Sequence, residues 1–145
     1  MGEKNENTNL ASEFYILSML HRNCIDATLT LGNKKSVDIV IVNKKGEVIT
    51  LDVKGAQKKS GSFPMENFIE KKNHYYAFVI LKGLEELPEV FIVPSEKIDV
   101  SYPQLKEVKG GKLLYHSPDN SRHTVDFGRL RKLKNLFQNN WDSFK

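Results

Sequence analysis

The sequence predicts an α/β fold with a mixed sheet, and three observations predict it. An N-terminal stretch has the spacing of an amphipathic helix, two apolar segments flank a tight turn, and seven consecutive apolar or aromatic residues occupy positions 75–81. The expected order is helix, three strands, helix, two strands, then a C-terminal appendage that ends in a basic helix. The 145 residues, 39% of them hydrophobic, are enough to bury a core as a single domain over 1–145.

The first helix is expected over residues 9–22, with Thr8 or Asn9 as its N-cap. Its apolar stripe consists of Leu10, Phe14, Ile16, Leu17 and Leu20. The other elements expected are strands at 25–31, 37–42 and 48–53, a loop at 55–62, a helix at 65–73, strands at 75–81 and 90–93, a short helix at 95–98, a hairpin at 113–125 and a basic amphipathic helix at 128–137. The core then spans about 9–94 and the extension about 95–145.

Composition excludes several classes of protein. No apolar run approaches the roughly 20 residues of a membrane span. The polar N-terminus resembles neither a signal peptide nor an anchor, so we expect a cytoplasmic protein with no membrane partner. Cys24 is the only cysteine, which excludes an internal disulfide and a cysteine-rich zinc site. The net charge of +4 suits an anionic partner such as nucleic acid.

Three charged residues lie in the hairpin formed by segments 37–42 and 48–53. Side chains alternate between the faces of a strand, so Asp52 and Lys54 project from the same face. If residues 44–46 form a three-residue turn, Asp38 lies directly opposite Asp52, whereas a two-residue turn puts the carboxylates on opposite faces. The three-residue turn is favoured because Gly46 occupies its third position, where the backbone is left-handed.

Two carboxylates that face each other across neighbouring strands repel, and a divalent cation between them would offset the repulsion. Oxygen ligands of this kind suit Mg²⁺ or Mn²⁺. Lys54 is then placed to orient or deprotonate a water molecule, or to neutralise charge on a phosphate. Glu13 lies inside the helix stripe, where a lone carboxylate is costly. We expect it to join the acidic cluster; the alternative is a rotated helix with Glu13 at its rim.

An acid, any residue and a lysine occur in succession three times, but only Asp52-Val53-Lys54 closes an apolar strand that has a second acidic residue opposite it. In this context the chain, over about 9–94, resembles the PD-(D/E)XK nuclease superfamily. The restriction-endonuclease-like core of that superfamily runs helix, three-strand meander, helix, strand. Small size and the helix glutamate are most similar to Holliday-junction-resolvase-like members. Val37 stands where the motif has proline.

The resemblance implies hydrolysis of phosphodiester bonds in DNA with Mg²⁺ or Mn²⁺. Asp38 and Asp52 would bind the metal, the Val53 carbonyl would add a ligand, Lys54 would position the water, and Glu13 would complete the site. The structure or sequence of the DNA substrate stays open. A homodimer is expected if both strands are cut, because each chain carries a single site.

Basic and polar residues near the predicted turns are candidate contacts to a phosphate backbone: Lys34, Lys35, Gln57, Lys58 and Lys59. Their alternative role is that of solvated turn tips and a flexible loop. The basic residues of the C-terminal helix offer a further DNA contact or a solvated face: Arg129, Arg131, Lys132 and Lys134.

Two other classes of function stay open at this point. One is a catalytically inert module that keeps the nuclease fold and binds DNA or a protein. The other is a plain α/β interaction protein in which Asp38 and Asp52 face solvent. A saturable Mn²⁺ or Mg²⁺ site that depends on Asp52 would separate the enzyme from both.

Overall fold

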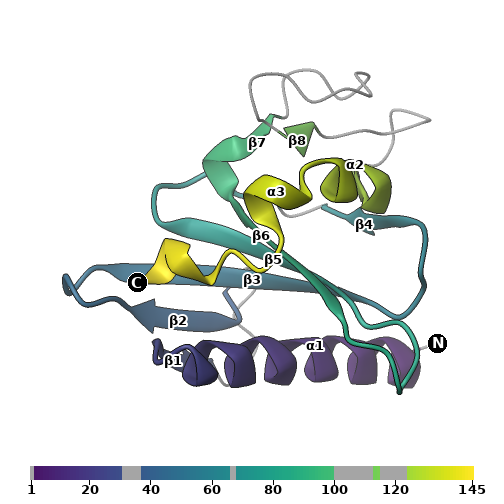
Figure 1. Cartoon of the computed structure of the whole chain (residues 1–145), viewed down its shortest axis with the longest axis horizontal. Coiled ribbons are helices and arrows are strands. Elements are labelled where there is room, and N and C mark those ends of the chain that lie inside the picture. The colour runs from purple at the N-terminus through teal and green to yellow at the C-terminus, as the bar shows by residue number, and fades with distance from the viewer. Residues whose placement is uncertain (1, 31–36, 66–67, 100–112, 115–123) are drawn as a thin grey trace.

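A computed structural model describes residues 2–30, 37–65, 68–99, 113–114 and 124–145 (Figure 1). Its central feature is a five-stranded sheet in the order β1-β2-β3-β5-β6. The elements are α1 (Gly2–Arg22), β1 (Asp26–Leu29), β2 (Ile39–Val42), β3 (Val48–Ala56), β4 (Ser62–Pro64), β5 (His74–Ile80), β6 (Glu89–Pro94), η1 (Ser95–Lys97), β7 (Ile98–Asp99), β8 (Leu113–Leu114), β9 (Thr124–Asp126), α2 (Phe127–Lys132), α3 (Lys134–Phe137) and η2 (Trp141–Phe144). Because β3 and β5 are parallel and the other neighbours antiparallel, the predicted α/β class with a mixed sheet is confirmed.

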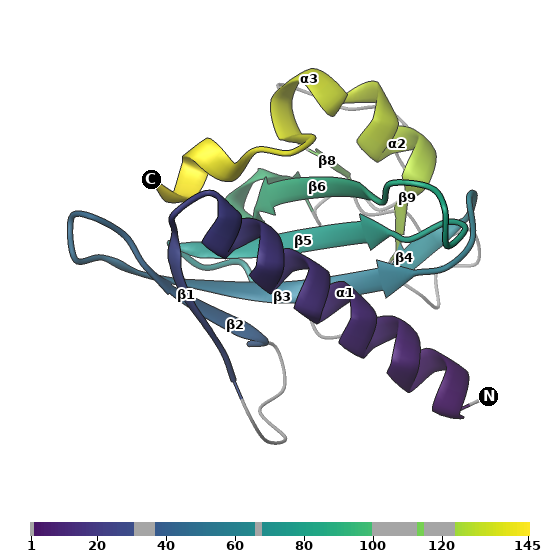
Figure 2. The same ribbon diagram turned by 60° about the horizontal axis from the view of Figure 1, so that its bottom comes forward.

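The two faces of the sheet are covered by different parts of the chain. Helix α1 lies against one face, and α2 and α3 lie on the opposite side (Figures 1 and 2). Ile16 and Leu20 of α1 share an apolar cluster with Val79 of β5, whereas Phe78 belongs to the cluster on the other face. Since neighbouring residues of a strand point to opposite faces, each central strand contributes to both cores.

The buried face of α1 differs from the predicted stripe. Ser12, Ile16 and Leu20 are fully buried, but Leu10 is 47% and Phe14 is 55% exposed, so the stripe was wrong at these two positions. The helix also begins at Gly2 rather than near residue 9. The helix is thus rotated about its axis relative to the prediction, because Ser12 makes the closest approach to the sheet. The spacing of apolar residues cannot identify a small polar residue in that role.

The helix predicted over 65–73 was wrong. Among the described residues of this segment, 65 and 68–73, none is helical, and the parallel crossover from β3 to β5 passes through β4 instead. Side chains take the place of helical hydrogen bonds. Ser95 Oγ accepts the backbone N–H of Lys71 and donates to its carbonyl, and Tyr76 Oη accepts the N–H of Ile69. Helix propensity was overridden by these tertiary partners.

The described residues 124–145 of the C-terminal extension contribute to the core. Val125, Phe127 and Leu130 are buried with the sheet residues of one face, and Phe144 reaches the cluster on the α1 side. The hairpin predicted over 113–125 was wrong, because β8 pairs with β7 and β9 pairs with β4. The predicted basic helix forms as two short helices, α2 and α3, and a final turn, η2, follows them.

Gly55 allows α1 to approach β3 closely, and this contact is testable. A methyl group on Gly55 would overlap the Ser12 hydroxyl and lie 2.8 Å from Ser12 Cβ. We expect Gly55→Ala to lower the free energy of unfolding by about 1–3 kcal/mol through overpacking. Urea denaturation of Gly55→Ala, Ser12→Gly and the double variant measures the coupling. The two changes should be clearly non-additive, since Ser12→Gly removes the overlap; simple additivity would contradict this packing.

Candidate active site

The β2–β3 hairpin has the predicted three-residue turn. The N–H of Asn43 donates to the carbonyl of Glu47 at 3.0 Å, and Gly46 has a φ of +81°. The paired residues run from Val42 with Val48 to Ile39 with Leu51. Regular pairing ends at Ile39 and Leu51, and Asp38 follows in a bend. The charge of Asp38 acts on the Asp52 carboxyl, so the two groups lie near each other, while their direct cross-strand facing stays a prediction.

Asp38 also holds the backbone of β3. Its Oδ2 accepts the N–H of Val53 at 2.7 Å, and its own N–H donates to the carbonyl of Leu51 at 2.8 Å. The N–H and C=O groups of one strand residue point to the same side of the strand. The Val53 carbonyl is therefore directed toward the side on which Asp38 lies, which suits the ligand role that the resemblance implies.

Asp52 and Lys54 form an ion pair on one face of β3. The Asp52 side chain is only 6% exposed and that of Lys54 is 27% exposed, and Lys54 Nζ lies 3.3 Å from Asp52 Oδ1. Burial raises the pKa of Asp52, the Lys54 ammonium opposes this rise, and the Asp38 carboxylate adds to it. Lys54 thus places a positive charge next to a buried carboxylate.

Glu13 brings a third carboxyl from α1 to this cluster. Burial, a hydrogen bond and charge repulsion from Asp38, and the charge of Asp52 raise the pKa of Glu13 to about 7. Glu13 is half-buried, one residue after the closest approach of α1 to the sheet at Ser12. The contact between Ser12 and Gly55 therefore sets the distance of Glu13 from the two aspartates.

The donor set fits a hard divalent cation. Carboxylate oxygens and a backbone carbonyl are the ligands that Mg²⁺ and Mn²⁺ prefer. No group of three or more His, Cys, Asp and Glu side chains within the described ranges is already arranged to hold a metal ion. In the arrangement seen, the Lys54 ammonium and the Val53 N–H occupy oxygens of Asp52 and Asp38. Metal binding would therefore exchange these partners.

His74 lies on the same face of the sheet as Asp52, because it pairs with Thr50. Its Nδ1 is 2.7 Å from Thr50 Oγ1, and its buried Nε2 has no hydrogen-bond partner among the described residues. Burial, followed by the charges of Lys71 and Lys54, lowers the pKa of His74. The parallel pairing of Thr50 with His74 brings it here, and no local pattern in the sequence signals that pairing.

The predicted phosphate contacts have different outcomes in the structure. Lys34 and Lys35 lie outside the described residues. Lys58 is exposed, as expected. Gln57 instead joins two elements, because its Nε2 donates to the Lys82 carbonyl at 3.2 Å and its Oε1 accepts from the Thr8 hydroxyl at 3.4 Å. Lys59 forms an exposed ion pair with Glu86 at 2.9 Å.

The basic C-terminal helix has mainly a structural role in its first turns. Arg129 is 5% exposed and lies 3.5 Å from Asp126, and Arg131 donates two hydrogen bonds to Glu89 at 2.8 and 3.1 Å. These two arginines do not form the solvated face that the sequence offered as one alternative. Lys132 and Lys134 are exposed.

Comparison with known proteins adds no family assignment. No protein-family model matches the sequence, and no curated protein or solved structure matches the chain. In the part of the chain that the structure describes, no helix is long and apolar enough to cross a membrane.

Glu13 should make the metal-free protein lose stability as pH rises from about 4.5 to about 7. In this window the folded carboxyl binds its proton more tightly than the unfolded one, so the folded state carries more protons and the free energy of unfolding falls with pH. In Glu13→Gln the decrease in the free energy of unfolding over this pH range should be smaller by on the order of 1 kcal/mol. The difference is modest because Glu13 is only half-buried and solvent screens its charge. Urea denaturation with chelator between pH 4 and 8 measures it, with the exposed Glu6→Gln as the matched control. Equal slopes for parent and Glu13→Gln would remove Glu13 from the cluster.

Asp38 should show opposite effects of charge and of hydrogen bonding on stability. Asp38→Asn keeps an oxygen for the Val53 N–H and removes a charge facing Asp52, so we expect the metal-free protein to be equally stable or stabilised by about 0.2–1 kcal/mol. Asp38→Ala leaves the N–H unsatisfied and should cost about 1–3 kcal/mol. Both variants should lose the rise in melting temperature that Mn²⁺ produces in the parent. An unchanged Mn²⁺ response in Asp38→Asn would exclude Asp38 as a ligand.

Proposed function

We propose that the protein is a metal-dependent endonuclease that hydrolyses phosphodiester bonds in DNA. One observation carries the proposal: Lys54 Nζ lies 3.3 Å from the buried Asp52, and the carboxylates of Asp38 and Asp52 both act on the pKa of Glu13. Three acidic groups and a lysine on neighbouring elements match the residue types of the PD-(D/E)XK site. Carboxylates that repel one another are expected to cost stability, which favours a functional reason for the cluster.

Within this proposal the acidic residues hold a Mg²⁺ or Mn²⁺ ion. Asp38 and Asp52 would be its side-chain ligands, the Val53 carbonyl would add a backbone ligand, and Glu13 would complete the set. The ion, when bound, stabilises negative charge on the phosphate and lowers the pKa of a water molecule. Because the pKa of Glu13 is about 7, this carboxyl is also suited to exchange a proton near neutral pH.

Lys54 is the residue proposed to position the attacking water. Its side chain is 27% exposed and its ammonium group lies 3.3 Å from Asp52, so it stands beside the carboxylates in a place that solvent partly reaches. A positive charge at this point orients a water molecule toward the phosphorus and offsets the charge that develops as the oxygen–phosphorus bond breaks. Its role requires no titration, because an ammonium group acts here as a donor and a charge.

An inert nuclease-fold module that binds DNA or a protein is the second candidate. The pairing of Lys54 with Asp52, together with the lack of a ready metal-ligand group in the described ranges, favours it. The two candidates differ in metal binding and turnover. The enzyme predicts a saturable Mn²⁺ or Mg²⁺ site that disappears in Asp52→Asn, and the inert module predicts none.

Cleavage should depend on Lys54 while metal binding should not. With a panel of branched, nicked, duplex and single-stranded DNA and with RNA, we expect Mg²⁺- or Mn²⁺-dependent cleavage by the parent. Lys54→Ala should cleave on the order of 10²–10³-fold more slowly, the range for loss of one group that stabilises transition-state charge. Calorimetric titration should show that the variant still binds Mn²⁺.

The exposed Lys97→Ala is the matched control and should cleave like the parent. Cleavage by Lys54→Ala at the parent rate would remove Lys54 from the mechanism. A parent that neither binds Mn²⁺ nor cleaves any member of the panel would leave the inert module as the better description.

A further inference from the structure

A hollow of about 540 Å³ lies where the turn between β5 and β6 reaches the N-terminal half of α1 (Figure 1). Tyr15 of α1 lines it, together with Gln57 after β3 and residues of the turn that include Leu84 and Leu87. Its volume suits a small-molecule site. Glu13 and Tyr15 are two residues apart and therefore about 200° apart around the helix, so the hollow and the candidate active site lie on different sides of α1.

The Gln57 side chain joins the two walls of the hollow. Its Oε1 accepts a hydrogen bond from the Thr8 hydroxyl at 3.4 Å, and its Nε2 donates to the Lys82 carbonyl at 3.2 Å. Both bonds are long and exposed to solvent. A side-chain amide has two N–H donors and two acceptor lone pairs, so one donor and one acceptor remain side by side among the described residues. The edge of a nucleobase presents the complementary pair, as adenine does to glutamine.

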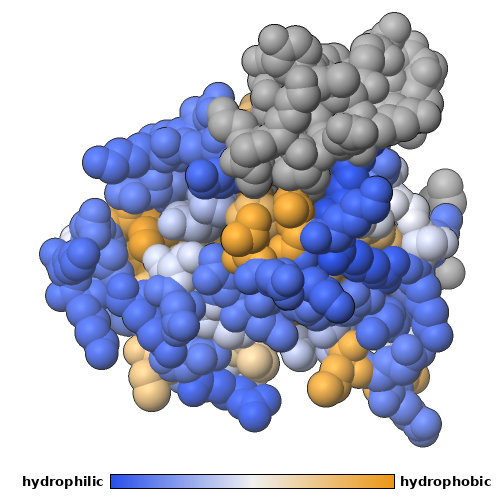
Figure 3. All heavy atoms as spheres, turned by 45° about the horizontal axis from the view of Figure 1, so that its top comes forward, coloured by the Kyte–Doolittle hydropathy of each residue, from blue (hydrophilic) through white to orange (hydrophobic). Residues whose placement is uncertain are grey.

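The walls of the hollow offer flat and apolar surface. Tyr15 contributes an aromatic ring from α1, and Leu84 and Leu87 on the turn are 101% and 82% exposed, the highest values among large hydrophobic residues of the described part of the chain. On the face drawn in Figure 3, apolar side chains are confined to separate patches in a largely hydrophilic surface. A planar ring packed between tyrosine and leucine side chains would cover apolar surface that water now reaches.

The charged groups beside the hollow already have partners within the chain. Lys82 Nζ lies 3.8 Å from Glu89 Oε1, and Glu86 Oε1 lies 2.9 Å from Lys59 Nζ. Because the charges of Lys82 and Glu86 are compensated in this way, the hollow suits an uncharged ring rather than a phosphate group.

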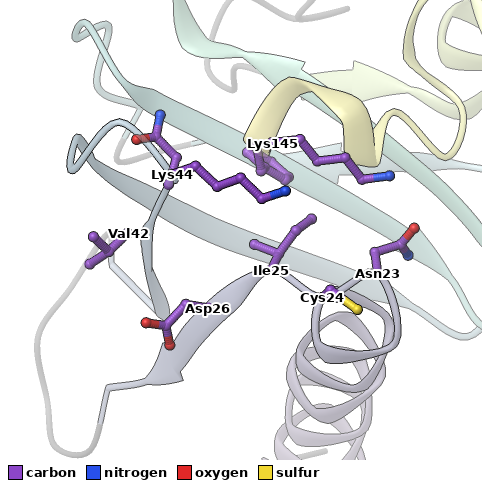
Figure 4. A pocket seen from close by; sticks show the side chains of 9 residues that line it. Asn23, Cys24, Ile25, Asp26, Val42, Lys44 and Lys145 are labelled. Atoms are coloured by element: carbon purple, nitrogen blue, oxygen red, sulfur yellow. The ribbon is translucent and has the colours of Figure 1, made fainter.

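A second hollow, of about 400 Å³ at the C-terminal end of α1, has a different chemistry. Figure 4 shows the long side chains of Lys44 and Lys145 along it, with Asp26 on the neighbouring strand. The Asn43 amide in its lining is used by the hairpin turn, because its Oδ1 accepts two backbone N–H groups of that turn. Asn43 therefore does not offer a base the pair of groups that Gln57 offers.

We propose that the hollow beside Gln57 binds a nucleobase. The ring would lie between Tyr15 and the two leucines, and its edge would pair with the Gln57 amide. A free nucleoside and an unpaired base of a nucleic-acid strand present the same ring, so either can supply it. Binding a base requires no cleavage, so this site is independent of the proposed nuclease activity. An apolar segment of a second copy is the competing occupant, but the amide pair together with an aromatic wall favours the base.

The riboside of 2-aminopurine is a suitable probe, because its fluorescence falls when the base stacks on an aromatic ring. With chelator present, the parent should quench it saturably. Gln57→Leu should weaken binding about tenfold, the effect of about one net hydrogen bond, and Leu87→Ala should weaken it by a similar factor through lost apolar contact. Leu136→Ala, at a position 53% exposed on α3, is the matched control and should bind like the parent. Melting curves verify that each variant is folded.

Two duplexes separate the sources of the base, one with 2-aminopurine as an unpaired bulge and one with the same base paired. Saturable quenching of the riboside identifies a free nucleoside as a sufficient ligand, and quenching of the bulged duplex alone identifies an unpaired base of a strand. Equal quenching by the parent and Gln57→Leu, or no quenching of either probe, would overturn the base site. If sedimentation shows a dimer that Leu87→Ala converts to monomer while neither probe is quenched, the hollow is an interface between copies and the base assignment is wrong.

The base site and the proposed nuclease can fail separately. A parent that cleaves DNA but quenches neither probe would overturn the base site alone. A parent that binds the riboside but neither binds Mn²⁺ nor cleaves DNA would overturn the nuclease alone.

Discussion

The register of the β2–β3 hairpin decides both the core and the candidate site. A one-residue slip in a hairpin turns every side chain of one strand to the other face. Such a slip would expose Ile39 and Ile41, which are fully buried on the α1 side, and would separate Asp38 from Asp52. The turn closed by Gly46, with its positive φ, excludes this alternative at the tip. Apolar burial and the geometry of the turn therefore favour the same pairing, and that pairing also brings Asp38 near Asp52.

The second constraint is the approach of α1 to β3. Ser12 is fully buried against Gly55, and Glu13 follows it directly in the helix. A residue with a side chain at position 55 would force the helix outward and carry Glu13 away from the aspartates. The glycine next to Lys54 thus contributes to the site without any chemistry of its own. Packing of the helix and assembly of the acidic cluster depend on one contact.

The sequence predicted those parts of the molecule that local rules determine. Alternation and the glycine of the turn were enough for the hairpin register, and the apolar run before Leu81 was enough for β5. The segment after Pro64 was misassigned because Ser95 and Tyr76, distant in sequence, bind its backbone. Leu10 and Phe14 were predicted on the buried face but are exposed. The spacing of apolar residues does not show which side of the helix lies closest to the sheet when a small residue, Ser12, makes that contact. His74 entered the region of the site only through the parallel pairing of β3 with β5.

The electrostatics of the cluster indicate how three acidic side chains and a lysine are accommodated in one site. Three carboxyl groups that repel one another are held near neutrality by the Lys54 ammonium beside Asp52 and by the proton that Glu13 retains up to a pH of about 7. The Lys54 ammonium and the Glu13 proton thus reduce the negative charge of the cluster in the absence of a metal ion. Under the proposed function, a divalent cation competes with both, so its binding releases a proton and frees the ammonium from Asp52. Lys54 then becomes free to contact water or phosphate only when the carboxylates have another partner. In this view the same residue protects the fold when the ion is absent and serves the reaction when it is present, which explains why a buried acidic cluster is compatible with a stable hairpin.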